Sequence, residues 1–129
     1  MLFHLNPRNL EINLPKDCYC FENESALGKT YVFKLLTLIN DYDMASCCCI
    51  TFKDWCTEPN VIAALTNRKY DYIFLDRFDL YATDGICKAI EKIRAESIIF
   101  MDIKNLKKVK YCFPEFADIR ITREKVEVY

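Results

Sequence analysis

Glycine and histidine are scarce in this chain, and long apolar runs are missing. Of its 129 residues, 2 are glycine and 1 is histidine. Tight turns must therefore rely on Asn, Asp and Pro, and Gly28 is conspicuous as one of the two positions with the backbone freedom of glycine. No apolar run approaches the roughly 20 residues that span a bilayer, and Asn6, Pro7 and Arg8 break the apolar start of the chain. The sequence therefore predicts a cytoplasmic protein with no signal segment and no membrane contact.

An excess of charge of one sign is also missing. The chain has 18 Lys and Arg residues against 19 Asp and Glu residues, which gives a net charge of -1. A nearly neutral protein has no general attraction to nucleic acid, so nucleic acid is not expected as a partner. The lysine-rich segment from Lys104 to Lys110 is interpreted as a solvated connector.

Cysteine is abundant, with 8 residues, but its spacing does not predict disulfides or a zinc site. Cys47, Cys48 and Cys49 are consecutive, so in a strand their side chains point to alternate faces. No C-x-x-C pair is followed by a second pair or lies near a histidine. The cysteines are expected to be mostly buried thiols in a reducing compartment. No Ser-His-Asp or Cys-His set can be assembled around His4, the single histidine.

The apolar segments predict strands that alternate with helices. Predicted strands cover residues 2–5, 10–14, 17–21, 45–52, 70–76, 97–103, 118–122 and 125–129. Predicted helices cover residues 29–40, 60–68 and 85–95. Strands that are apolar on both faces are typical of a parallel sheet covered by helices on both sides. We therefore expect one α/β domain over residues 1–129: a three-layer sandwich with a mainly parallel sheet and short antiparallel edge strands at both ends.

The segment between the strand 17–21 and the helix 29–40 predicts a phosphate-binding loop. It reads Asn23, Glu24, Ser25, Ala26, Leu27, Gly28, Lys29 and Thr30. This matches the Walker A pattern G-x-x-x-x-G-K-[ST] at its last three positions, with Asn23 in place of the first glycine. Asn enters left-handed conformations at a lower cost than most residues. In such a loop the backbone N–H groups surround phosphate, the lysine neutralises its charge and the hydroxyl binds Mg²⁺. The alternative is an ordinary helix start capped by Ser25.

An acid follows the buried strand 70–76. Asp76 ends the run Tyr72-Ile73-Phe74-Leu75-Asp76, which resembles a Walker B element whose Asp holds Mg²⁺ directly or through water. Because ligands of parallel α/β sheets bind beyond the carboxyl ends of the strands, we expect Asp76 to lie near Thr30. The alternative is a solvated acid at the end of a strand.

The two motifs occur in this order, with one strand between them along the chain and another apolar strand, 97–103, after the second. This arrangement resembles the additional-strand division of P-loop NTPases, which includes ABC, RecA-like and AAA-type ATPases. The resemblance covers roughly residues 17–122, although only the two short motifs are specific. It implies ATP and Mg²⁺ as ligands, with Lys29 on the phosphates and with Thr30 and Asp76 on the metal. It also implies a polar sensor of the terminal phosphate after the strand 97–103, for which Asn105 is the favoured candidate over Asp102 and Lys104.

Several features of that division are absent from the sequence. Arg77 stands where a catalytic glutamate commonly follows the Walker B acid, and Asp79 can replace that glutamate only if the chain bends favourably. Neither a helical lid nor a long arginine-finger helix is expected. The sequence therefore predicts slow hydrolysis or none, and no catalytic residue is assigned.

The sequence leaves open alternatives to a nucleotide-binding protein. One is a non-enzymatic regulator or inhibitor of a larger protein partner, built on a degenerate P-loop scaffold. Self-association is a further possibility, in which Arg77 or Arg94 of a neighbouring copy supplies the missing arginine. Phe52 and Trp55, near the end of the strand 45–52, form either a wall on which a base stacks or a part of the core and its rim.

Overall fold

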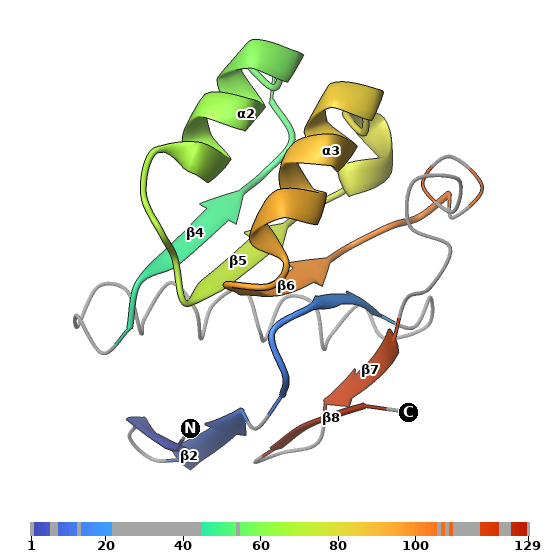
Figure 1. The fold of residues 1–129 in the computed structure, drawn as a ribbon. Coiled ribbons are helices and arrows are strands. Elements are labelled where there is room, and N and C mark those ends of the chain that lie inside the picture. The colour runs from blue at the N-terminus through green and yellow to red at the C-terminus, as the bar shows by residue number, and fades with distance from the viewer. Residues whose placement is uncertain are drawn as a thin grey trace.

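Strands and helices alternate over residues 47–101, as Figure 1 shows for this computed structural model. The structure describes residues 2–5, 8–12, 14–21, 45–53, 55–105, 107, 109, 117–121 and 125–128. The strands are β1 (Leu2–Leu5), β2 (Arg8–Ile12), β3 (Cys18–Phe21), β4 (Cys47–Ile50), β5 (Tyr72–Leu75), β6 (Ile98–Met101), β7 (Ala117–Ile121) and β8 (Lys125–Val128). The helices are α2 (Glu58–Thr66), α3 (Asp84–Ile93) and the short 3-10 helix η1 (Phe78–Leu80).

These elements form an α/β fold around a mainly parallel sheet, as predicted. The strand order is β1-β2-β8-β7-β3-β6-β5-β4, and the run from β7 through β3, β6 and β5 to β4 is parallel throughout. All four residues of β5 and of β6 are buried, which agrees with their continuously apolar sequences. Each predicted element that falls within the described residues is present, with ends displaced by a few residues.

Each end of the chain adds an antiparallel pair of strands, as predicted. β1 pairs antiparallel with β2, and β7 with β8, but a parallel contact between β2 and β8 joins both pairs on one side of the sheet. Among the described strands the outermost are therefore β1 and β4, and β4 is itself a parallel strand. Its edge position explains why Cys48 and Cys49 are only half buried although the strand is apolar.

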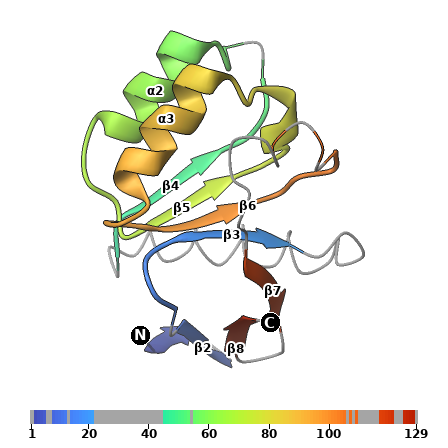
Figure 2. The ribbon, with the colours of Figure 1, turned by 45° about the vertical axis from the view of Figure 1, so that its right-hand side comes forward.

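The helices α2 and α3 lie side by side on one face of the parallel strands (Figures 1 and 2). Helix α3 turns Ile86 and Ile90 into the core, and α2 contributes Val61 and Leu65. Thr83 caps α3 because its side chain accepts a hydrogen bond from the Ile86 N–H at 3.3 Å. The helix predicted for residues 29–40, on which the third layer of the expected sandwich depends, lies outside the described residues. None of the described helices is long and apolar enough to cross a membrane.

The seven described cysteines are thiols. Burial raises the pKa of Cys18 to about 12, and burial together with the neighbouring Cys49 raises the pKa of Cys47 to about 12. Both side chains are therefore uncharged at neutral pH and react slowly as nucleophiles. Their role in the described part of the chain is packing, as the sequence predicted.

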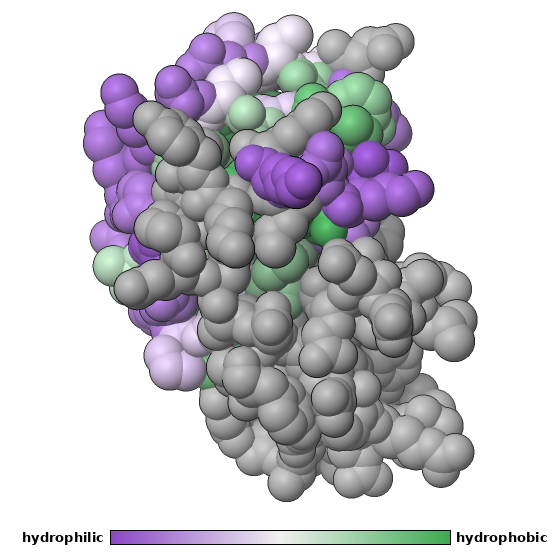
Figure 3. Space-filling model, turned by 90° about the vertical axis from the view of Figure 1, so that its right-hand side faces the viewer, coloured by the Kyte–Doolittle hydropathy of each residue, from purple (hydrophilic) through white to green (hydrophobic). Residues whose placement is uncertain are grey.

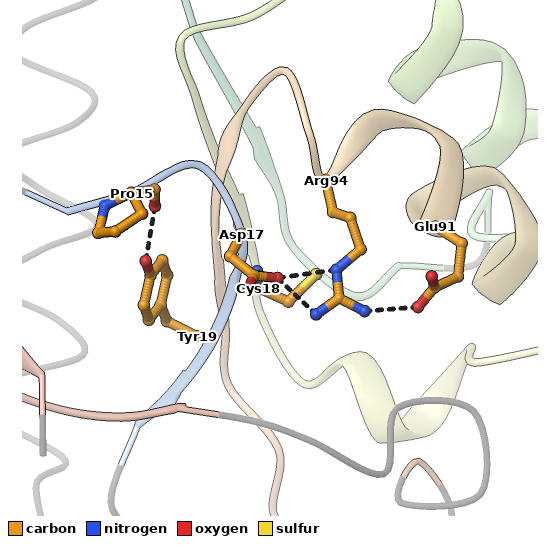
Figure 4. A network of polar contacts seen from close by, with 6 residues as sticks. All are labelled: Pro15, Asp17, Cys18, Tyr19, Glu91 and Arg94. Atoms are coloured by element: carbon orange, nitrogen blue, oxygen red, sulfur yellow. Dashed lines mark hydrogen bonds and ion pairs between the residues drawn. The ribbon is translucent and has the colours of Figure 1, made fainter.

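A polar network fixes the start of β3 to the end of α3 (Figure 4). Arg94 donates from Nε to Oδ1 of Asp17 at 2.7 Å, and its Nη2 donates to the same oxygen. Its Nη1 donates to Oε1 of Glu91 at 2.6 Å. Asp17 also accepts from the N–H of Cys18 at 2.8 Å, and the hydroxyl of Tyr19 donates to a backbone carbonyl four residues earlier. The network therefore holds in place the strand that leads into the predicted phosphate-binding loop.

We expect the Arg94–Asp17 pair to make a measurable contribution to stability. Arg94→Met should lower the free energy of unfolding by about 1 kcal/mol, because both side chains are partly exposed and solvent weakens the pair. A double-mutant cycle with Asp17→Asn, followed by urea unfolding, should give a coupling energy of about 0.5–1 kcal/mol. Lys88→Met, which replaces an exposed cation on the same helix, is the control. Strictly additive losses would show that the two side chains do not stabilise each other.

Candidate functional site

Asp76 and Asn105, the predicted site residues that the structure describes, lie at the edge of the sheet where the parallel strands end. β3, β4, β5 and β6 run in the same direction, so the residues that follow them leave the sheet at one edge, called here the carboxyl edge (Figure 1). The register aligns these ends, because Cys20 pairs with Met101 and Met101 pairs with Leu75. Ligands of parallel α/β sheets bind beyond this edge.

The loop predicted to bind phosphate begins two residues after β3. Its residues, Asn23 to Thr30, lie outside the described part of the chain, so their roles stay predictions. What the structure gives is the point from which the loop departs. Phe21 is the last residue of β3, at the carboxyl edge and beside β6 and β7.

Asp76 follows β5 directly, at the same edge. Its N–H donates to the carbonyl of Ile50 at 2.8 Å, and its carbonyl accepts from the hydroxyl of Tyr81 at 2.9 Å. These two bonds fix the backbone of Asp76, and the residue is half buried. The loop strand β3 and the acid strand β5 are not neighbours, since β6 lies between them.

After Asp76 the chain reverses over the end of β6. Arg77 has φ 47° and ψ 48°, and it is the one described residue other than glycine with positive φ. This left-handed turn starts η1, whose first residue, Phe78, donates its N–H to the carbonyl of Asp102 at 2.8 Å. Asp102 in turn donates its N–H to the carbonyl of Leu75 at 2.9 Å. The segment from Arg77 to Asp79 therefore lies against the carboxyl end of β6, the strand next to β3.

Asp79 is a buried carboxylate at this edge that accepts hydrogen bonds from two segments. Its side chain is 2% exposed. It accepts from the N–H groups of Lys104 and Asn105 at 3.2 and 3.3 Å, and from Nε and Nη2 of Arg77 at 3.4 Å each. Burial alone would raise the pKa of Asp79, but the hydrogen bonds from Arg77 and the two amides outweigh burial and lower it. Asp79 therefore ties η1 to the connector after β6, and both of its carboxylate oxygens already accept hydrogen bonds within the chain.

The connector after β6 brings Asn105, the predicted phosphate sensor, to the carboxyl edge. Asn105 is exposed, and its backbone is fixed by the bond from its N–H to Asp79. Lys104 and Lys107 are also exposed in this segment. Arg94 lies at the opposite edge, near the start of β3, where two carboxylates of its own chain bind it. Of the two arginines considered for phosphate contact, Arg77 is the one at the carboxyl edge.

Large apolar side chains are exposed at the same edge. Phe52, Trp55 and Leu80 have exposed fractions of 46%, 41% and 42%. Phe52 lies nearly parallel to the ring of Tyr81, with centroids 6.2 Å apart and 14° between the planes. The side-chain amide of Asn60 donates to the carbonyl of Trp55 at 2.9 Å and so fixes that loop. Figure 3 views the molecule from this side, where hydrophobic surface adjoins strongly hydrophilic surface in the described part.

The described part of this edge contains no grouped metal site. Among the described residues, no three His, Cys, Asp or Glu side chains are grouped so as to hold a metal ion. A cavity of about 160 Å³ lies at the opposite edge, between the ends of α2 and α3. Its walls include Leu65, Ile73 and Ile93, and Arg68 and Glu96 lie at its rim. None of the predicted site residues lines it.

Sequence reasoning missed the roles of Tyr81, Leu80 and the left-handed Arg77. In the sequence Tyr81 is one aromatic residue among other apolar residues, and no sequence pattern predicts a left-handed backbone conformation at Arg77. Asp79 was noted in the sequence, but its contacts with the connector depend on the tertiary structure.

Comparison with family models, with curated proteins and with solved structures gave no match, so the interpretation of the site depends on its own geometry.

We expect Asp79→Asn to destabilise the protein. An amide has one acceptor oxygen, so one of the two N–H groups that now face Asp79 would face an NH₂ group instead. The free energy of unfolding at pH 7 should fall by about 1–3 kcal/mol, measured by urea unfolding. Glu96→Gln, an exposed charge removal, should change it by less than about 0.5 kcal/mol.

The same contribution should depend on pH. The pKa of Asp79 is lowered from its ordinary value of 3.8 in the folded protein, so its stabilising effect is present above pH 3.8. It is lost as the pH falls through the lower pKa of the folded state. The difference between wild type and Asp79→Asn should therefore shrink below about pH 4. A difference that is constant down to pH 2 would contradict an ionised Asp79.

Proposed function

We propose that this protein binds a nucleoside triphosphate with Mg²⁺, with ATP favoured, and hydrolyses it slowly or not at all. The observation that carries the proposal is the position of β6 between β3 and β5 in a parallel sheet. Because of it, the segment 22–30 and Asp76 depart from one edge, from strands separated by a single strand. A loop and an acid that act on the same phosphates need this proximity.

The strand order adds support from the resemblance noted in the sequence. A strand inserted between the loop strand and the acid strand is what the additional-strand interpretation requires, and β6 has that place in the sheet. The strand is also central and fully buried, so its position is determined by packing on both faces.

Each expected role follows from the chemistry of the side chain. Lys29 would neutralise phosphate charge, and the backbone from Asn23 to Gly28 would donate N–H groups to phosphate oxygens. Thr30 and Asp76 would hold Mg²⁺, which prefers oxygen ligands and keeps several waters when one or two protein groups bind it. Asp76 fits this role, because its half-buried carboxylate lies just beyond a strand end on a fixed backbone. Bound Mg²⁺ would offset the negative charge of the phosphates.

Slow hydrolysis is the expectation that the described residues support. Arg77 follows Asp76 at the position where a catalytic glutamate is expected, and a guanidinium does not accept a proton from water. Asp79, the nearest other carboxylate in the chain, is buried and accepts hydrogen bonds from two amides and an arginine. Neither side chain is suited to activate a water molecule.

The second candidate is a regulator that binds a larger protein partner. Three large apolar side chains exposed at the carboxyl edge, Phe52, Trp55 and Leu80, favour it, because exposed hydrophobic clusters are common at protein interfaces. This candidate does not need a working phosphate site. A folded protein that binds no nucleotide would therefore favour it over the first.

Calorimetric titration of the reduced protein with Mg-ATP and Mg-GTP tests the first candidate. We expect a dissociation constant in the micromolar range for Mg-ATP, and a loss of roughly a hundredfold in Lys29→Ala, because the phosphate charge then has no lysine to pair with. Asp76→Asn should weaken binding in the presence of Mg²⁺ but have little effect in its absence.

Lys88→Ala is the matched control, since Lys88 is an exposed lysine on α3, outside the proposed site. Circular dichroism should show that each variant is folded. If Lys29→Ala and wild type bound Mg-ATP with equal affinity, the assignment of the loop would be wrong. It would also be wrong if the wild type bound neither nucleotide.

A further inference from the structure

The cavity at the edge opposite the carboxyl edge lies where α2 and α3 end (Figure 1). Its volume is about 160 Å³. Four of the residues that line it are exposed, namely Thr66, Arg68, Lys69 and Glu96. The cavity is therefore open to solvent. Apolar cavities of about 150 Å³ hold a ligand the size of benzene, so the space is large enough for one small organic molecule.

The inner wall of the cavity is apolar. It is formed by Leu65 of α2, Ile73 of β5 and Ile93 at the end of α3. Leu65 and Ile73 are each 1% exposed and belong to the main core, and Ile93 packs against that core. Such a wall of branched aliphatic side chains favours an apolar group of similar size, because contact removes the apolar surface of both from water.

The Thr66 and Ser97 hydroxyl groups in the wall are already engaged within the protein. Thr66 donates to the carbonyl of Ile62 at 2.7 Å, and Ser97 donates to the carbonyl of Tyr70 at 2.6 Å. The second bond joins the segment before β5 to the segment before β6, so it also fixes the shape of the cavity. Water gains few hydrogen bonds from such a wall, and an apolar group displaces it favourably.

Charges of opposite sign lie on the two sides of the rim. Arg68 and Lys69 follow α2, and Glu96 follows α3. The Arg68 guanidinium lies over the ring of Tyr70, 5.3 Å from its centroid, which restricts its position. In the described part of the chain, no ion pair engages the charged groups of Lys69 and Glu96. The rim therefore presents both signs of charge to a ligand.

The ends of the two helices modify these charges in different ways. The last carbonyls of a helix carry a partial negative charge of about half an elementary charge. At the end of α3 this charge adds to that of Glu96, so this side of the rim favours a cation. At the end of α2 the full charges of Arg68 and Lys69 outweigh it, so that side favours an anion.

We propose that this cavity binds a free α-amino acid with an apolar side chain. The carboxylate contacts Arg68 and Lys69, the ammonium contacts Glu96, and the side chain lies against the apolar inner wall. Both charged groups of an α-amino acid are attached to one carbon atom, so both reach the rim of a single small cavity. A carboxylate or an amine alone matches one side of the rim only. The inference does not depend on the proposed function, because the cavity lies at the opposite edge of the sheet.

The test titrates isotope-labelled protein at neutral pH with L-leucine and with two analogues that each lack one charged group, 4-methylpentanoate and 3-methylbutylamine. The shifts of backbone amide signals in NMR spectra report binding. We expect a dissociation constant of roughly 0.1–1 mM for leucine, and binding about tenfold weaker for each analogue. The largest shifts should come from residues 65–70 and 93–97.

Substitutions at the rim separate the contributions of the two charges. Glu96→Gln should weaken leucine binding by roughly tenfold and should not weaken binding of 4-methylpentanoate, which has no ammonium. Arg68→Gln should weaken binding of both. Ile93→Phe places a larger side chain in the cavity and should abolish binding of both. Lys88→Gln, which changes an exposed lysine of α3 that does not line the cavity, is the control and should bind leucine like wild type.

Three results would overturn the inference. The first is the absence of leucine-dependent shifts at the residues of the cavity. The second is equal affinity of the wild type for leucine and for either analogue. The third is equal weakening of leucine and 4-methylpentanoate by Glu96→Gln. Arg68 and Glu96 are exposed, so their variants should fold and decide the question even if Ile93→Phe does not fold.

Discussion

The parallel pairing of β6 with both β3 and β5 is the constraint on which the carboxyl edge depends. Met101 of β6 lies opposite Cys20 of β3 on one side and Leu75 of β5 on the other. Met101 and Leu75 are fully buried and Cys20 is nearly so. A shift of one residue in either pairing would turn the buried side chains of a strand to the opposite face, so the register is strongly determined. The three strand ends are thereby aligned, and so are the residues that follow them.

That alignment also explains why the turn after Asp76 has its unusual form. The chain must leave β5, cross the end of β6 and still bring Thr83 to the start of α3 on the covered face. A left-handed residue at Arg77 allows the reversal within a short distance. Asp79 then bonds to the connector after β6, which joins two segments that are 25 residues apart in sequence. A buried carboxylate with several donors is a strong local constraint, since removing it leaves those donors without an acceptor.

Much of the parallel core could be predicted from the sequence, because its signals are local. The continuous apolar runs of β5 and β6 indicated buried parallel strands, and the spacing of Ile86 and Ile90 indicated α3. The place of Asp76 followed from its position at the end of a strand. These features depend on hydrophobic periodicity, which tertiary contacts rarely override in central elements.

The remaining features depend on contacts that the sequence does not reveal. The join between β2 and β8 places both antiparallel pairs on one side of the sheet, and only the assembled sheet determines it. Arg77, Asp79 and Asn105 come together because η1 folds over β6, which no local pattern encodes. Phe52 and Trp55 are exposed in the segment after β4, where the sequence left open whether they form a wall for base stacking or a part of the core and its rim. The loop from Asn23 to Thr30 remains a sequence-based prediction.

Paramagnetic broadening tests the central claim, that metal and phosphate bind at the carboxyl edge. Mn²⁺ takes the place of Mg²⁺ with ATP, and the broadening of backbone amide signals in NMR spectra reports the distance of each amide from the metal. We predict the strongest broadening for residues 28–30, 76–79 and 102–105, and the weakest for residues 68–70 and 94–97 at the opposite edge. Broadening centred on the opposite edge, or no ATP-dependent broadening at all, would contradict the account.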